Sequence, residues 1–195
     1  MIKLKNSLTK KVEKVIPVEE GKIKLYNCGP TVYGRVHLGN LRAYVAWDVM
    51  ARAYRYLGIN VDRVINITDV GHMSGDESFG DDKVELQARE ENLDPLSIAD
   101  KYIVKVLEDF KKMNILHPDG TEVNSDVELS QLRKYGWVRA TDSIDDIIEV
   151  IKKIVENGYT YETEQALYFD VTKYGDYSRS VSYTHLRAHE TVLDL

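Results

Sequence analysis

The sequence predicts an α/β fold built on a parallel sheet, and three consecutive segments support that prediction. A short strand is expected at 23–27, a helix at 41–57 and a second strand at 61–68, all within about forty-five residues. Parallel strands need a long crossover connection, which is usually a helix. The succession strand, helix, strand is therefore typical of a βαβ unit and of the α/β class.

The first strand is expected directly after a turn. Residues 1–21 are interpreted as an extended lead-in that ends in the turn EEG. The following stretch, IKLYN, begins with apolar residues that alternate with lysines, which predicts a strand with one buried face. Gly29 and Pro30 then end the strand, because these residues are typical of turns.

The helix and second strand are expected from spacing and residue type. Apolar residues recur every four positions, at Leu41, Val45, Val49 and Ala53. Gly58 stands where a helix C-terminus favours glycine. The stretch at 61–68 is rich in β-branched residues, which favour strands.

The second half of the chain is expected to contain two more helices and a hairpin. A polar loop at 71–82 precedes a helix whose apolar stripe runs from Ile98 to Met113, with Ser97 as the predicted cap. The polar stretch 121–137 matches no element. A strongly amphipathic helix is expected at 144–157, with Ser143 as its cap and its isoleucines packed inward. The β-rich runs at 159–163 and 166–171 predict a hairpin.

Composition excludes several classes of protein. The chain has 195 residues with 26 basic and 32 acidic side chains, and a net charge of −6 does not favour a protein that coats nucleic acid. No apolar run approaches the ~18 residues of a membrane helix, so no membrane partner is expected. Cys28 is the single cysteine, which favours a reducing compartment and predicts a cytoplasmic protein.

The residues best suited to binding or catalysis lie between the first strand and the first helix. The sequence CGPTVY follows the strand, and His37-Leu38-Gly39-Asn40 precedes the helix. Open α/β sheets bind ligands at the carboxyl ends of their strands, and a helix N-terminus favours phosphate. An imidazole there can donate to a phosphoryl oxygen. The alternative for His37 is a loop histidine that only hydrogen-bonds the start of the helix.

The longer stretch CGPTVYGRVHLGNLRAYVAWDVM resembles the first signature of class I aminoacyl-tRNA synthetases, specifically the cysteine–tRNA ligase family. In that family a CGPTVY turn leads into the HIGH motif, and a strand ending in N-[IV]-T-D follows the helix. Here that strand end is Asn66-Ile67-Thr68-Asp69. The resemblance runs from about Lys22 to about Ser180. It implies a Rossmann-like fold of the nucleotidylyl-transferase type, of which this chain would hold the first half of the parallel sheet and an inserted α+β region.

The resemblance also implies roles for individual residues. The HIGH-motif positions are His37, Gly39 and Asn40, which would bind ATP, with His37 and Asn40 as catalytic groups. Asn40 stands where the motif has its second histidine. The resemblance further implies an amino-acid pocket formed by Cys28, Gly29, Thr31 and Thr68.

Cofactors and partners follow from the same resemblance. Cys28 would be the first ligand of a Zn²⁺ ion that binds the substrate's thiolate, a soft ligand that zinc prefers to a hydroxyl. ATP with Mg²⁺, cysteine and tRNA(Cys) would be the substrates and partners. The reaction would form cysteinyl-adenylate and pyrophosphate, and the cysteinyl group would then pass to the tRNA.

The resemblance predicts three regions and an incomplete site. Residues 1–115 would belong to the first half of the catalytic domain and 116–180 to the start of the inserted domain. Residues 181–195 no longer resemble the family and are either an artefact of a broken reading frame or a native divergent terminus. The family's other zinc ligands and its KMSKS motif would lie downstream, so the chain alone is expected to be inactive.

Two other functions stay open from the sequence. A relative of this ligase that joins cysteine to an amino sugar would use the same zinc and ATP halves. A non-catalytic nucleotide-binding module would keep the βαβ unit without the reaction.

Overall fold

The computed structural model describes residues 2–71, 82–124, 126–164 and 166–175. They form two compact units, one of residues 17–144 and one that combines residues up to Ile16 with those from Asp145 onward. The expected loop at 71–82 lies outside the described residues except for its two end residues. The tail at 181–195 lies entirely outside them. Within the described ranges, no helix is both long and apolar enough to cross a membrane. The expected division into catalytic and inserted domains at 115/116 stays a prediction.

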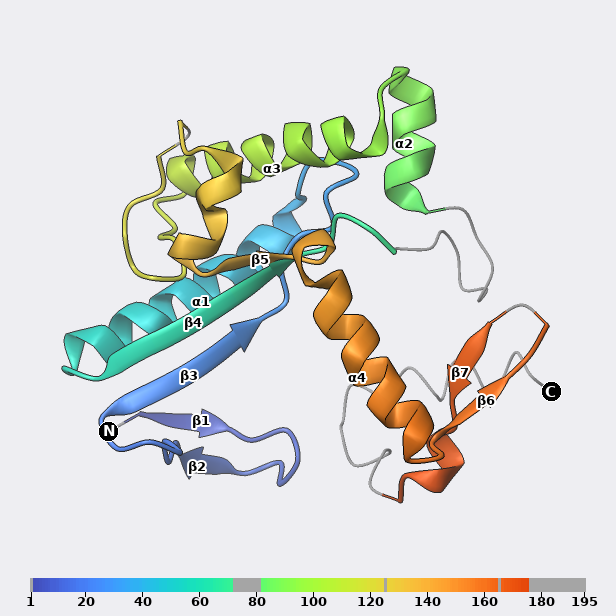
Figure 1. The fold of residues 1–195 in the computed structure, drawn as a ribbon. Coiled ribbons are helices and arrows are strands. Elements are labelled where there is room, and N and C mark those ends of the chain that lie inside the picture. The colour runs from blue at the N-terminus through green and yellow to red at the C-terminus, as the bar shows by residue number, and fades with distance from the viewer. Residues whose placement is uncertain (1, 72–81, 125, 165, 176–195) are drawn as a thin grey trace. The chain divides into compact units, whose positions relative to one another are not determined.

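Residues 17–144 contain a parallel three-stranded sheet, which confirms the predicted α/β class. The strands are β3 (Lys22–Asn27), β4 (Asn60–Ile67) and β5 (Trp137–Arg139), and they lie in the order β3-β4-β5. Helix α1 (Leu38–Tyr56) connects β3 to β4, as Figure 1 shows. Ile23 lies beside Val61 and Ile65 beside Trp137 in the parallel registers. The βαβ unit expected from the sequence is present.

Strand β5 was not predicted. The stretch 121–137, which matched no element, contains a 3₁₀ helix (Leu129–Tyr135) followed by Gly136 with a φ of 87° and the first residue of β5. A strand of three residues is too short to show an alternating pattern. Its pairing with β4 and the complete burial of Trp137 define it, and both are tertiary features.

Helix α1 begins earlier than expected and buries a different set of residues. It starts at Leu38 instead of residue 41, because His37 caps it. Val49, one position of the apolar repeat that predicted the helix, is 59% exposed, whereas Tyr44, Asp48, Ala51 and Tyr54 are buried. Leu41 and Val45 of the predicted repeat do pack against the core as partly buried residues, so the apolar pattern identified part of the buried face but missed the aspartate and the two tyrosines.

Two further helices belong to the same unit and contribute residues to its hydrophobic core. They are α2 (Lys83–Glu91) and α3 (Pro95–Lys112). Asp94, not Ser97, is the N-cap of α3: its carboxylate accepts from the Ser97 amide, and Pro95 takes the first helical position, where a missing N–H costs nothing. The predicted stripe of α3 is buried as expected up to Phe110, but Met113 is exposed.

The core lies between β4, α1 and α3. Phe110 contacts Tyr44 of α1 at 5.1 Å and Trp137 of β5 at 5.3 Å between ring centroids. Ile65, Ile67 and Ile103 are almost completely buried with them. This aromatic contact chain joins three elements that are far apart in the sequence.

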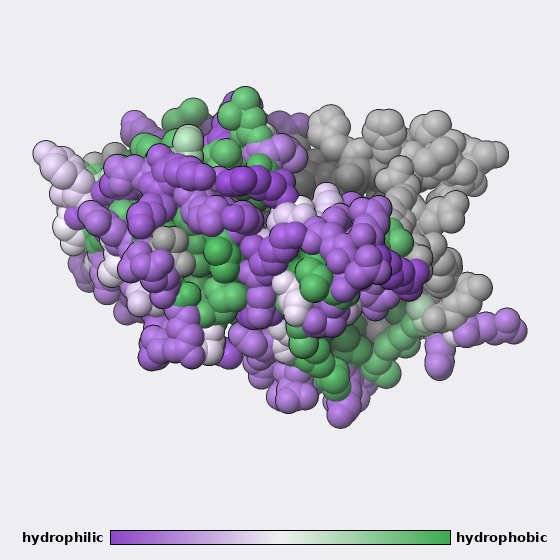
Figure 2. Space-filling view, turned by 90° about the horizontal axis from the view of Figure 1, so that it is seen from above, coloured by the Kyte–Doolittle hydropathy of each residue, from purple (hydrophilic) through white to green (hydrophobic). Residues whose placement is uncertain are grey.

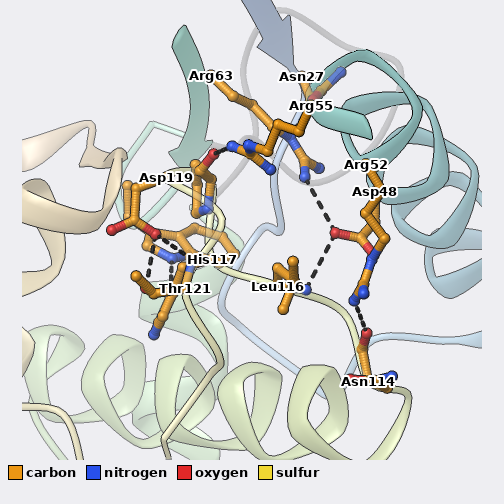
Figure 3. A network of polar contacts seen from close by, with 12 residues as sticks. Asn27, Asp48, Arg52, Arg55, Arg63, Asn114, Leu116, His117, Asp119 and Thr121 are labelled. Carbon is orange, nitrogen blue, oxygen red and sulfur yellow. Dashed lines mark hydrogen bonds and ion pairs between the residues drawn. The ribbon is translucent and has the colours of Figure 1, made fainter. Parts of the chain in front are cut away.

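A buried polar network occupies the same unit. Arg63 of β4 is completely buried, donates to Asn27 at 2.7 Å and lies 3.7 Å from the Asp48 carboxylate (Figure 3). Asp48 also accepts from Arg52 and from the Leu116 amide. Burial lowers the pKa of Arg63 to about 10, although Asp48 opposes that shift. These hydrogen bonds and ion pairs hold the segment after α3, which contains Leu116, against α1 and β4.

The second unit contains two hairpins and a helix. Strands β1 (Lys3–Lys5) and β2 (Val12–Lys14) pair antiparallel, so the expected extended lead-in is in fact a hairpin. The predicted second hairpin is confirmed as β6 (Thr160–Glu162) and β7 (Leu167–Phe169). The predicted turn at 19–21 belongs to the unit of residues 17–144, and there the Lys22 amide donates to the Glu19 carbonyl.

Helix α4 (Ile144–Glu156) is confirmed, but its packing is not. Apart from the half-buried Ile154, the apolar residues that were expected to pack inward are exposed: Ile147, Ile148 and Ile151, for example, are 41% to 45% exposed. Ser143 belongs to a 3₁₀ turn and does not cap the helix. Figure 2 shows hydrophobic patches that interrupt a largely hydrophilic surface. The pattern predicts a helix face that favours burial, but it does not supply a partner for that face.

Candidate functional site

The candidate site is formed where β3 and β4 end. Thr31 and Thr68 lie side by side in an isolated parallel bridge that continues the β3–β4 pairing. The Val32 amide donates to the Thr68 carbonyl at 3.1 Å, and the Thr68 amide donates to the Pro30 carbonyl at 2.9 Å. The structure therefore brings together three of the residues predicted for one pocket, Gly29, Thr31 and Thr68.

Gly29 is required by close contact with β4. A Cβ atom at this position would lie 1.5 Å from the carbonyl oxygen of Asn66. The Gly29 amide donates to Asn66 Oδ1 at 2.8 Å, and Asn66 Nδ2 donates to Thr68 Oγ1 at 3.1 Å. Asn66 therefore connects the segment after β3 with the end of β4.

His37 and Asn40 form a reciprocal cap at the start of α1. His37 Nδ1 accepts from the Gly39 amide at 3.0 Å, and Asn40 Oδ1 accepts from the His37 amide at 3.3 Å. Because Nδ1 is an acceptor, the neutral imidazole carries its hydrogen on Nε2. Because a backbone N–H can only donate, Asn40 presents Nδ2 at its other end. Both side chains thus offer donors at a helix N-terminus, which favours an anion.

A depression of about 160 Å³ lies beside this cap. Nine residues line it: Gly29, Pro30, Thr31, Tyr33, Gly34, Arg35, Val36, His37 and Asn40. Four of them, at positions 29, 31, 37 and 40, were predicted site residues. Cys28, Gly39 and Thr68 do not line it, although each is adjacent in sequence or by hydrogen bonding to residues that do.

Cys28 follows β3 directly and is exposed. Burial, and secondarily the Coulombic effect of the nearby Cys28, raises the pKa of Tyr44 to about 12. Among the described residues, no group of three or more His, Cys, Asp or Glu side chains could hold a metal ion. The residues on the described part of the chain therefore do not by themselves fit a zinc centre.

Asp69 anchors the end of β4 to two other elements. Its buried carboxylate accepts from Arg139 Nε at 2.8 Å and from the Thr141 hydroxyl at 2.6 Å. Burial acts to raise its pKa, but the hydrogen bonds from Thr141 and Arg139 hold that pKa below the usual value. Arg139 also pairs with Asp100 of α3 at 2.8 Å. Thr68 is therefore held in place from the side of β5 and α3.

Arg35 holds the loop before α1 in the same way. Its guanidinium makes two hydrogen bonds to Asp109 of α3, at 2.8 and 3.1 Å. Sequence reasoning assigned no role to Arg35, Asn66 or Asp69. Of these three residues, Asn66 could have been identified from the sequence, because it lies two positions before Thr68 and so shares its face of the strand.

The fold and the cap define the class: an α/β domain with a helix N-terminus that presents hydrogen-bond donors beside the carboxyl ends of its parallel strands. The chain belongs to the family described as the tRNA synthetases class I (C) catalytic domain, whose sequence profile matches residues 14–192. This confirms the family resemblance. The match includes most of the stretch 181–195, whose interpretation as a tail foreign to the family stays a prediction.

Individual relatives agree with the family match. The chain is 41% identical over 179 residues to a cysteine–tRNA ligase of Treponema denticola and 40% identical over 172 residues to one of Zymomonas mobilis. It is 38% identical over 179 residues to a cysteine–tRNA ligase of Pyrococcus furiosus. These alignments cover 90%, 88% and 92% of this chain, but 33%, 30% and 32% of the relatives. The chain spans about a third of the length of the curated relatives it matches.

Proposed function

We propose that the chain supplies the ATP- and cysteine-binding part of a cysteine–tRNA ligase, which activates cysteine with ATP and transfers it to tRNA(Cys). The observation that carries this proposal is the reciprocal cap at 37–40, which presents donors beside the depression at the strand ends. The names of the relatives support the choice of cysteine and tRNA.

His37 and Asn40 would act on the phosphates. The Nε2 hydrogen of His37 and the Nδ2 hydrogens of Asn40 would donate to phosphoryl oxygens, and Gly39 would let the nucleotide approach the backbone. A carboxylate oxygen of cysteine would attack the α-phosphorus, and the bond to pyrophosphate would break. Fixed donors stabilise the charge that develops in such a step.

Cys28, Gly29, Thr31 and Thr68 would contact the amino acid. The bridge between Thr31 and Thr68 supports a shared pocket for their hydroxyl groups. Zn²⁺ and Mg²⁺ remain predictions. Cys28 would contribute one zinc thiolate, and its partners would have to come from outside the described residues, so no step is assigned to the metal.

The test is cysteine-dependent ATP–pyrophosphate exchange by the full-length product of the natural gene. We expect exchange with cysteine and at least a hundredfold less with serine, and transfer of labelled cysteine to tRNA(Cys). Exchange without transfer to tRNA, but with transfer to an amino sugar, would favour the amino-sugar ligase instead. ATP binding without any exchange would favour a non-catalytic module. We further propose that the 195-residue chain alone shows no exchange, since it spans about a third of its relatives.

A further inference from the structure

We propose that Arg35 and Asp109 form a positioning pair that holds His37 where its Nε2 hydrogen meets the phosphates, and that Arg35 does not itself bind ATP. The inference rests on the proposed function and deepens it. It gives a role in the exchange reaction to an ion pair between the loop that joins β3 to α1 and the C-terminal end of α3, although neither residue would contact a substrate.

The charge of the Arg35 guanidinium is already engaged by carboxylates of α3. Its Nε and Nη2 atoms donate to the two carboxylate oxygens of Asp109 at 3.1 and 2.8 Å, and Nη2 lies 3.8 Å from Glu108. Two parallel hydrogen bonds to one carboxylate fix a guanidinium in direction as well as in position. Arg35 lines the depression beside the cap, but its positive charge is balanced within the protein before a nucleotide binds.

Asp109 is a rigid attachment point for the loop. Its side chain is only 14% exposed. The next residue, Phe110, is completely buried and packs against the rings of Tyr44 and Trp137. Because a close-packed core allows its side chains little displacement, this part of α3 is fixed relative to α1 and β5. Arg35 therefore connects the loop to the core of the unit.

The cap by itself holds His37 less firmly. The Gly39 amide donates to His37 Nδ1 at 3.0 Å, and the His37 amide donates to Asn40 Oδ1 at 3.3 Å. Both hydrogen bonds are exposed, so water competes for the same donors and acceptors. A side chain that must aim its Nε2 hydrogen at a phosphate needs an attachment beyond its own helix turn.

The loop supplies that attachment two residues before His37. The guanidinium of Arg35 is bound to α3, and the partly buried side chain of Val36 packs against the core. Fixing these two residues leaves the backbone of His37 little room to shift. A displacement of about 1 Å in a catalytic group can cost about a hundredfold in rate, so the attachment matters for the reaction.

The first test compares Asp109→Asn with Arg35→Gln in the full-length natural protein, by cysteine-dependent ATP–pyrophosphate exchange. Asparagine turns a donor toward one N–H of Arg35, so the paired hydrogen bonds are lost at nearly constant volume. We expect kcat to fall about tenfold in both variants, while the KM for ATP and the KM for cysteine change less than about twofold. A KM for ATP that rises in Arg35→Gln but not in Asp109→Asn would overturn the proposal, because it would show that Arg35 binds the nucleotide directly.

Two further variants test the geometry of the pair. Arg35→Lys keeps the charge but cannot form two parallel hydrogen bonds, so its kcat should fall by about fivefold or more. Glu108→Gln is the matched control: it removes the same charge one residue earlier, where the distance to Arg35 is too long for a hydrogen bond. Its kcat should stay within about twofold of wild type. A wild-type kcat in Arg35→Lys, or an equal loss in Glu108→Gln, would show that charge suffices and would contradict the proposed geometry.

A double-mutant cycle shows whether the pair acts through His37. The Nε2 donor is absent in His37→Ala, so its position no longer matters there. Adding Asp109→Asn to His37→Ala should therefore lower kcat by less than about a further twofold. A further loss as large as in the wild-type background would mean that the pair acts on another part of the site, and the proposal would fail.

Hydrogen exchange gives a readout besides activity. The Gly39 amide, which donates to His37, should exchange about tenfold faster in Asp109→Asn, because the cap loosens. The Gly29 amide, which donates to Asn66 Oδ1, should keep its rate. Equal acceleration at both amides would reveal a general loosening and refute a local role. Wild-type protein without cysteine-dependent exchange would overturn the proposed function itself, whereas an active wild type with an unchanged kcat in Asp109→Asn would overturn only the role of the pair.

Discussion

Trp137 donates its Nε1 hydrogen to Nδ1 of His117 at 2.9 Å, and both side chains are almost completely buried. Tyr135 stacks on the same imidazole with 4.5 Å between ring centroids. Because Nδ1 accepts, the neutral ring carries its hydrogen on Nε2, which has no hydrogen-bond partner among the described residues. A protonated His117 would direct a second N–H at Trp137 and break this contact.

This relationship predicts a loss of stability in mild acid. Burial lowers the pKa of His117 below its usual value, with Asp119 acting in the opposite direction. Below about pH 6.5 the unfolded chain therefore binds more protons than the folded chain, so stability present above that pH is lost as the pH falls. Urea unfolding of the 195-residue chain at pH 7.5 and 5.5 measures the loss. His117→Asn, which keeps an acceptor but does not titrate, should be less stable at pH 7.5 and should flatten this pH dependence. An equally steep dependence in that variant would contradict the assignment.

Asp48 is expected to be the most sensitive position of the buried network. Asp48→Asn leaves Arg63, whose side chain is fully buried, without its carboxylate partner. Removing one partner of such a pair costs about 3 kcal/mol or more of unfolding free energy. Glu85→Gln is the matched control, because its contact with Arg89 lies on the surface and should cost less than about 1 kcal/mol. Equal losses in the two variants, measured by urea unfolding, would contradict the role of Asp48.

Gly29→Ala is expected to disrupt the candidate site. Its new Cβ would lie 1.5 Å from the Asn66 carbonyl oxygen, so β3 and β4 would have to separate at this point. Gly34 in the same loop has open space at the corresponding position, and Gly34→Ala should be tolerated. We expect the first variant to lose at least about 2 kcal/mol of stability and the second less than about 0.5 kcal/mol. Thermal unfolding of both variants, followed by circular dichroism, measures the difference, and similar midpoints would contradict the close contact.

His37→Asp separates capping from catalysis. Aspartate is a good N-cap and its charge suits a helix N-terminus, so stability should stay within about 0.5 kcal/mol of wild type. His37→Ala, in contrast, should lose about 1 kcal/mol. Both variants lack the Nε2 donor, and both should lose about a hundredfold in ATP–pyrophosphate exchange by the full-length protein. Retained exchange in His37→Asp would show that His37 acts only as a cap.

Prediction from the sequence succeeded where local patterns are strong. The β3–α1–β4 unit was predicted within a few residues, because alternation in IKLYN and the β-branched run before Thr68 are visible without tertiary information. The pocket residues Gly29, Thr31 and Thr68 were proposed from a motif, and the structure places them together. Their roles in binding remain to be tested.

The errors have two physical causes. Val49 fits a four-residue apolar repeat, yet the buried face of α1 carries Asp48 because Arg63 of β4 lies opposite it. Ser97 has the right residue type for a cap, but Asp94 three positions earlier has it too, and Pro95 favours that earlier start. The first error depended on Arg63, a neighbour distant in sequence, whereas the second overlooked the local signal of Asp94 followed by Pro95.

The sequence by itself determined the α/β class, the order of its first strands and helix, and the segment that carries the candidate chemistry. Periodicity and turn residues act between near neighbours along the chain, so they can be recognised in one dimension. Only the tertiary structure decided that Trp137 starts a third strand, that His117 is buried, and that Asn66 hydrogen-bonds both Gly29 and Thr68. Those features depend on burial, on hydrogen bonds between residues distant in sequence and on which face of a strand meets a neighbour. Such contacts form only when the chain has folded.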